Sequence, residues 1–97
     1  MTCYNAGLTI EASVRSIIAQ TFTNWELVLV DNCSTDNSLA VVQKFEDSRI
    51  RIIALETNHG RTGALNIALN NALAEFVAIL DADDISDPER LQMQNDY

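Results

Sequence analysis

The chain has 97 residues, of which 47% are hydrophobic, so it is long enough for one small domain and too apolar to be disordered. Its net charge of −8 argues against nucleic acid and anionic membranes as partners. No apolar run approaches the ~20 residues that span a bilayer, and the first residues lack the basic region and apolar core of a signal peptide. We therefore expect a cytoplasmic protein.

The cysteines carry no metal or redox motif. Cys3 and Cys33 are isolated, without a Cys-x-x-Cys spacing, which favours two reduced thiols in a cytosolic protein. A bridge between them stays open as an alternative, because both are predicted to lie near strand ends.

The first part of the chain is predicted to fold as strand, helix, strand. Residues 1–3 have the pattern of the end of a strand, and residues 4–7 that of a turn. Apolar side chains spaced i, i+4, i+7 and i+8 then predict an amphipathic helix over residues 10–20. Residues 26–30 form a second apolar strand, which ends in the acid Asp31.

A second helix and a third strand follow. Residues 32–37 are expected to form a loop in which Ser34 and Thr35 are candidate N-caps. The helix after it is predicted to stop around Asp47, and residues 50–55 have the composition of a third strand. Two arginines favour a sheet edge for this strand, where charge discourages further pairing: Arg49 and Arg51.

The remaining elements complete an alternating pattern. Residues 56–63 form the most polar loop, and an apolar stripe from Leu65 to Leu73 predicts a third helix. An apolar strand over residues 76–80 comes next, and Asp87 followed by a proline opens a last helix. The order predicts an α/β fold, a three-layer α/β/α sandwich around a mostly parallel Rossmann-like sheet.

Three carboxylates follow the last apolar strand within four positions: Asp81, Asp83 and Asp84. Burying unpaired charges is costly, so they should lie just past the carboxyl end of the sheet, where open α/β sheets bind ligands. Asp81 and Asp83 should point the same way, with only Ala82 between them. We expect them to hold one Mg²⁺ or Mn²⁺ ion with substrate phosphates. The alternative is an acidic turn that caps the next helix.

The other strand ends bring further polar groups to the same edge. Tyr4 could stack on a base, with Asn5 beside it, and Asp31 could accept a hydrogen bond from a base N–H. Arg61 could meet a phosphate near a helix N-terminus. Plainer interpretations stay open: Tyr4 covers the sheet end, Asp31 caps a turn, and His59 is a solvated loop residue. The loop lacks a P-loop pattern, and no Gly-x-Gly-x-x-Gly is present.

An ordered series of motifs resembles the nucleotide-binding half of the family-two inverting glycosyltransferases, which have the GT-A fold. The resemblance covers essentially all 97 residues. The matching stretches, in chain order, are Tyr4-Asn5, residues 20–26, residues 30–36, Asn58-His59-Gly60, residues 64–66, residues 80–84 and residues 87–91.

The resemblance implies a donor-binding subdomain over residues 1–97, truncated at both ends. It implies a nucleoside-diphosphate sugar, often a UDP-sugar, with Asp31 at the base and Tyr4 beside it. It also places Asp81 near the ribose or sugar and Asp83 on manganese or magnesium at the diphosphate. The metal would act as a Lewis acid on the leaving group.

The resemblance has two departures, and both concern what the chain lacks. Family members often carry an arginine where this chain has Leu65, and Arg61 is a candidate substitute. The family's second half, with the acceptor site and the catalytic base, is absent, so we expect no transfer by the chain alone. Apolar surface left uncovered would favour self-association, and the parent protein would act in the cytoplasm or at the inner membrane face.

Two other functions remain open from the sequence. One is a nucleotide-binding module without catalysis of its own. The other is a phosphatase of the haloacid-dehalogenase type, which also uses a strand-end Asp-x-Asp. Its aspartates follow the first strand of the fold, whereas here they follow the fourth, which disfavours it. The donor sugar, the acceptor and the oligomeric state are not encoded in any motif.

Overall fold

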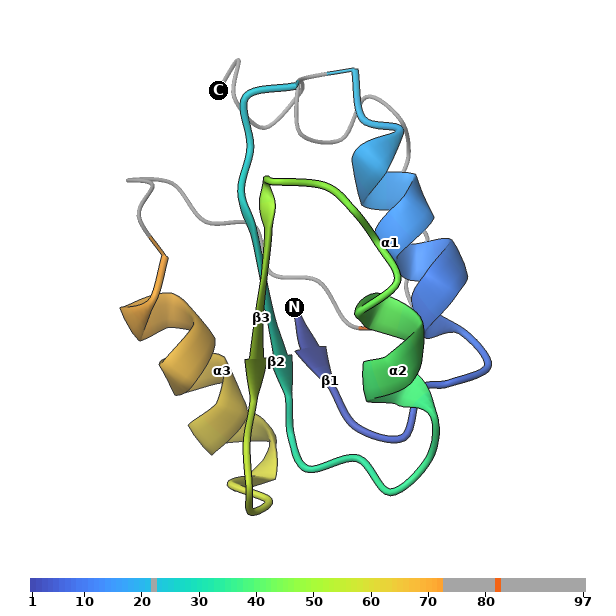
Figure 1. Cartoon of the computed structure of the whole chain (residues 1–97). Helices are drawn as coiled ribbons and strands as arrows, with labels where there is room; N and C mark the ends of the chain where they lie inside the picture. The colour runs from blue at the N-terminus through green and yellow to red at the C-terminus, as the bar shows by residue number, and fades with distance from the viewer. Residues whose placement is uncertain (22, 73–81, 83–97) are drawn as a thin grey trace.

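The computed structural model describes residues 1–21, 23–72 and 82. Strands and helices alternate in these ranges, in the order β1 (Thr2–Cys3), α1 (Ile10–Ile18), β2 (Leu27–Asp31), α2 (Ser38–Val42), β3 (Ile50–Ala54) and α3 (Gly60–Asn70). The strands form one parallel sheet in the order β1-β2-β3 (Figure 1). The expected strand over residues 76–80 and the last expected helix lie outside the described residues.

The sheet register brings the strand ends together. Cys3 pairs with Asp31, and Asp31 pairs in turn with Ala54. All strands run the same way, so their carboxyl ends and the loops that follow lie at one edge, at the bottom of Figure 1. This edge is where a parallel α/β sheet offers polar side chains to a ligand.

The helices cover both faces of the sheet, as predicted. In Figure 1, α1 and α2 lie on one side of β2 and α3 lies on the other. Alternate residues of β2 point to the two sides, so that Leu27 and Leu29 join one core cluster and Val28 and Val30 join the other. All five residues of β2 are buried, as the predicted three-layer architecture requires of a strand covered on both faces.

The three helices differ from the predicted boundaries. Helix α1 ends at Ile18, and α2 covers only Ser38–Val42, so the chain from there to Asp47 is not helical. Neither candidate N-cap serves α2, because Asn37 occupies that position. Helix α3 begins at Gly60, inside the predicted loop. It buries Ala64 and Ala68, whereas Leu69 is exposed. The small alanine side chains on the buried face let the helix pack closely against the sheet.

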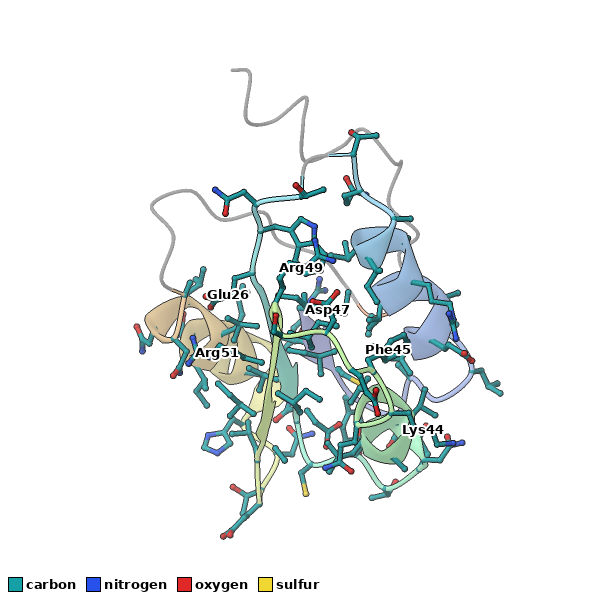
Figure 2. The ribbon with its side chains drawn as sticks, turned by 45° about the horizontal axis from the view of Figure 1, so that its top comes forward. Glu26, Lys44, Phe45, Asp47, Arg49 and Arg51 are labelled. Atoms are coloured by element: carbon teal, nitrogen blue, oxygen red, sulfur yellow. The ribbon has the colours of Figure 1, made fainter. Side chains whose placement is uncertain are left out.

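Strand β3 ends the strand order in the described sheet, as its charge predicted. Arg49 lies 3.8 Å above the Trp25 ring and pairs with Asp47 at 2.7 Å. Arg51 pairs with Glu26 at 3.0 Å and also donates to the Asn71 carbonyl. Figure 2 labels these charged side chains along β3 and its neighbouring loops. They hold the amino-terminal side of the sheet, away from the ligand edge.

Candidate functional site

The loop after β1 is fastened to the loop after β2 by three successive backbone amides. The Asn5 amide donates to Ser34 Oγ at 3.0 Å, and the Ala6 amide donates to Ser38 Oγ at 2.8 Å. The Gly7 amide donates to Asp36 Oδ2 at 3.0 Å. Since these N–H groups already have partners, they are not free to bind a phosphate.

Asn5 contributes its side chain to the same connection. Its Oδ1 accepts from the Thr35 amide at 2.8 Å and from the Asp36 amide at 3.3 Å. Asn5 has φ of 50°, a left-handed conformation that asparagine tolerates better than most residues. Cys33 has φ of 62° in the facing loop. Both strand ends therefore carry a non-glycine residue in a costly conformation.

Asp31 is a buried carboxylate at the end of the central strand. Only 2% of the residue is exposed. Its Oδ1 accepts a 2.6 Å hydrogen bond from the Ser34 hydroxyl, and its Oδ2 accepts a long 3.4 Å bond from the Ser34 amide. An ionised carboxylate has about four acceptor positions. Ser34 therefore satisfies one oxygen well and leaves the second with acceptor capacity.

The Cys3 thiol beside Asp31 favours its neutral form. Cys3 faces Asp31 across the β1–β2 pair, and burial raises the pKa of its thiol, with a smaller contribution from the Asp31 charge. Cys3 and Cys33 are both free thiols.

A second network joins the end of β2 to the start of α3. Asn32 Oδ1 accepts from the His59 amide at 2.8 Å, and Asn32 Nδ2 donates to the Gly60 carbonyl at 3.2 Å. Asn58 donates to the Asn32 carbonyl and accepts from the Gly60 amide at 2.8 Å. These paired asparagines fix the N-terminus of α3 beside the end of the central strand.

A hollow of about 250 Å³ opens at this edge of the sheet. The residues around it come from β1, from the positions directly after β1 and β2, and from the start of α3 with the loop before it: Thr2, Cys3, Tyr4, Asn32, Asn58 and Arg61. Tyr4 is 52% exposed, so its ring is accessible. Arg61 is the second residue of α3. The structure thus brings the predicted Tyr4 and Arg61 to one hollow, with Asn5 and Asp31 directly beside the lining residues in sequence.

The acidic motif itself lies outside the described residues, because only Ala82 between Asp81 and Asp83 is described. Ala82 is buried, and its carbonyl accepts hydrogen bonds from Ser13 Oγ at 2.7 Å and from Thr9 Oγ1 at 3.2 Å. Two hydroxyls from the start of α1 therefore hold the Ala82 carbonyl. Within the described ranges, no three His, Cys, Asp or Glu side chains gather in a way that could hold a metal ion.

Sequence reasoning missed several of these polar residues. Asn32 and Ser34 lie in the matching stretch 30–36, but the sequence gives no role to Asn32 and only a helix-cap role to Ser34, and Thr9 and Ser13 lie in no motif. Their signal is weak: each is a short polar residue beside a strand end or on a helix start. Their partners include residues 27 and 73 positions away along the chain, so no local pattern could identify them.

A parallel sheet with polar groups at its carboxyl edge is typical of nucleotide-binding enzymes. The sequence pattern of the family "Glycosyl transferase family 2" matches residues 1–97. The chain belongs to this family. The phosphatase alternative finds no support in these matches.

Named relatives and solved structures agree with this assignment. The chain is 46% identical over 94 residues to the Escherichia coli UDP-Glc:alpha-D-GlcNAc-diphosphoundecaprenol beta-1,3-glucosyltransferase WfgD, covering 97% of this chain and 37% of that protein. It is 40% identical over 96 residues to the putative teichuronic acid biosynthesis glycosyltransferase TuaG of Bacillus subtilis, covering 97% of this chain and 38% of that protein. The chain thus spans less than two-fifths of the length of these relatives.

The fold matches crystal structures of S. aureus TarS. In the complex with UDP-GlcNAc the TM-score is 0.92 and the identity 34%, with 98% of this chain and 28% of that chain covered. The complex with UDP gives a TM-score of 0.90 at 35% identity, covering 98% and 29%. These matches confirm the α/β GT-A fold. Among the helices that are described, none has the length and apolarity needed to cross a bilayer.

Proposed function

We propose that the carboxyl edge of this sheet binds the nucleotide part of a UDP-sugar, and that the whole protein transfers the sugar to an acceptor with inversion. The family membership and the UDP and UDP-GlcNAc complexes of TarS support this choice of ligand. The residues assigned to each part of the ligand are our proposal.

The observation that carries the proposal is the partly satisfied carboxylate of Asp31. Both oxygens of Asp31 have a partner, but the bond to Oδ2 is 3.4 Å long, and a uracil N3–H is a further donor that this oxygen can accept. Because Asp31 is only 2% exposed, such a donor must reach a buried carboxylate. Tyr4, exposed on the neighbouring strand end, supplies an aromatic face for the base. Asn5 holds the two loops in place beside it.

The diphosphate is proposed to lie between α3 and the acidic motif. Arg61, in the first turn of α3 and on the hollow, offers charged donors to a phosphate. Asp81 and Asp83 would hold Mn²⁺ or Mg²⁺, since carboxylates are the hard oxygen donors that these ions prefer. When bound, such an ion neutralises charge on the leaving diphosphate as a Lewis acid. The Thr9 and Ser13 hydroxyls keep the connecting Ala82 backbone in place.

The catalytic base and the acceptor site are proposed to lie outside this chain. Within it, the strand-end acids have tasks on the donor side, and removing a general base typically costs ~10²–10⁴-fold in rate. Acceptor positioning would be lost as well. The relative WfgD carries a diphosphoundecaprenol acceptor in its name, which supports action of the parent protein at the inner face of a membrane. Self-association through surface that the rest of the protein covers is a further expectation.

Binding of UDP to Asp31 variants tests the site. We expect Asp31→Ala to weaken UDP by about 1–3 kcal/mol, because the base N–H loses its acceptor. Asp31→Asn keeps the shape of the side chain. It should also bind UDP weakly, because its NH₂ group would face the uracil N3–H, and two donors cannot form a hydrogen bond. Normal UDP affinity in both variants would show that Asp31 only stabilises its turn.

The metal proposal needs a separate measurement. UDP should bind more tightly in manganese than in EDTA, and Asp83→Ala should abolish this difference while leaving metal-free binding unchanged. Equal affinity of the unmodified protein under both conditions would contradict metal assistance.

The second candidate function is a nucleotide-binding module without catalysis of its own. The short span of this chain relative to its relatives favours this description of the chain by itself. A transfer assay with UDP-sugars and mixed acceptors separates the two, by comparing this chain with the longer parent protein. Comparable turnover would place the base within this chain and make Asp84 the first candidate for it.

A further inference from the structure

The Ser34 hydroxyl links the loop after β1 to Asp31, the carboxylate that is proposed to recognise the base. It accepts from the Asn5 amide at 3.0 Å and donates to Asp31 Oδ1 at 2.6 Å. A hydroxyl has one proton. Since the amide must donate, the proton of Ser34 is directed to Asp31. The result is a chain of two hydrogen bonds from the end of β1 to the carboxylate on β2.

Ser34 is neither a helix cap nor the sole link between the two loops. It does not cap α2, which begins at Ser38 after Asn37. The loops are also joined by the amides of Ala6 and Gly7 and by the Asn5 side chain. The connection between the loops therefore does not depend on the Ser34 hydroxyl. The orientation of the Asp31 carboxylate does depend on it. Ser34 donates to both oxygens of that carboxylate, through its hydroxyl and its amide.

The consequence for a ligand follows from the two carboxylate oxygens. Ser34 binds Oδ1 through a short, charge-assisted hydrogen bond, which makes Oδ2 the oxygen left for a ligand. The Asn5 amide belongs to the peptide bond that follows Tyr4. The same hydroxyl therefore also contacts the backbone next to the aromatic residue.

We propose that Ser34 is a specificity-determining positioning residue, which orients Asp31 to accept the imino N–H of a pyrimidine base. This inference rests on the proposed function of Asp31. It goes beyond that function by assigning base selectivity to a serine that does not itself touch the ligand. Removing the hydroxyl should therefore cost selectivity for the base more than it costs the folded structure.

The test compares UDP with N3-methyl-UDP, which lacks the imino N–H, in the full-length protein. Losing one hydrogen bond to a charged acceptor should make the unmodified protein prefer UDP by about tenfold or more. Ser34→Ala should lower this preference to less than about threefold, mainly by weakening UDP. Ser34→Thr keeps a hydroxyl and should retain the preference. Ser48→Ala, the same change at an exposed serine just before β3 and away from the carboxyl edge, is the matched control and should retain it too.

The outcomes separate the two proposals. If the unmodified protein binds both nucleotides equally, the base contact of Asp31 is wrong, and the role of Ser34 fails with it. If the unmodified protein discriminates and Ser34→Ala discriminates equally well, the Asp31 contact stands and the positioning role of Ser34 is overturned. Should Ser34→Ala fail to fold, Ser34→Cys provides the measurement, because a thiol keeps the volume but is a weak donor. It should lose most of the preference, and full retention would overturn the proposal.

Discussion

The Ala82 carbonyl offers a quantitative test of how α1 supports the acidic motif. It is shared by two hydroxyls, Ser13 Oγ at 2.7 Å and Thr9 Oγ1 at 3.2 Å. Ser13 is fully buried and Ala82 is 6% exposed. Either hydroxyl alone can satisfy the carbonyl, whereas the loss of both leaves a buried acceptor without a partner among the described residues.

This arrangement predicts that the two substitutions are not additive. Ser13→Ala should cost about 0.5–1.5 kcal/mol, the net value of one hydrogen bond, since Thr9 still satisfies the carbonyl. Thr9→Val should cost no more than about 0.5 kcal/mol, because Thr9 is exposed and its bond is long. The double variant adds the penalty of an unsatisfied carbonyl, about 1–3 kcal/mol. We therefore expect a coupling energy of about 1 kcal/mol or more between the two sites.

Thermal and urea unfolding of the four proteins measures this coupling. For a domain of this size, 1 kcal/mol corresponds to a shift in Tm of about 4–8 °C. Thr62→Val, on an exposed position of α3, is the matched control for a threonine-to-valine change on a helix and should stay within about 0.5 kcal/mol. If the cost of the double variant equals the sum of the single costs within about 0.3 kcal/mol, the hydroxyls do not share the carbonyl.

Two further predictions concern stability. Cys33→Gly should stabilise the protein by up to about 1.5 kcal/mol, the difference between relief of the left-handed conformation, about 1–2 kcal/mol, and the entropy cost of glycine, about 0.5–1 kcal/mol. Cys33→Ala keeps the strain, so an equal rise in Tm in both variants would contradict this reasoning. The hydrogen bond from the Arg49 side chain lowers the pKa of Asp47 from 3.8 to about 2. A pKa lower in the folded state than in the unfolded state adds stability above about pH 4, which is lost as the pH falls toward about 2. Unfolding measured between about pH 5 and pH 2 should therefore show a shallower loss in Asp47→Asn, and identical acid profiles would count against the pair.

The local pattern of the sequence determined the architecture of this chain. Alternating apolar stripes with helical spacing and short apolar runs predict strands and helices in turn, and the described structure has this order. Strand β2 has four apolar residues followed by Asp31, and all five are buried, as expected for a continuous apolar run in a parallel sheet. The position of Asp31 at the carboxyl end of that strand followed from the same run. The expectation that Tyr4 and Arg61 would lie at this edge followed from the predicted parallel topology, which brings the ends of all strands together.

Only the tertiary structure decided which polar groups form hydrogen bonds with one another. Ser34 meets the Asn5 amide across 29 residues of chain, and Ser13 meets the Ala82 carbonyl across 69. Helix α3 likewise turns Ala64 and Ala68 toward the sheet rather than Leu69, a choice that depends on how closely the helix can approach. Hydropathy is a property of each residue and repeats along the chain, so it can be read locally. A hydrogen bond between distant segments depends on distances that exist only after the sheet has brought its strand ends together.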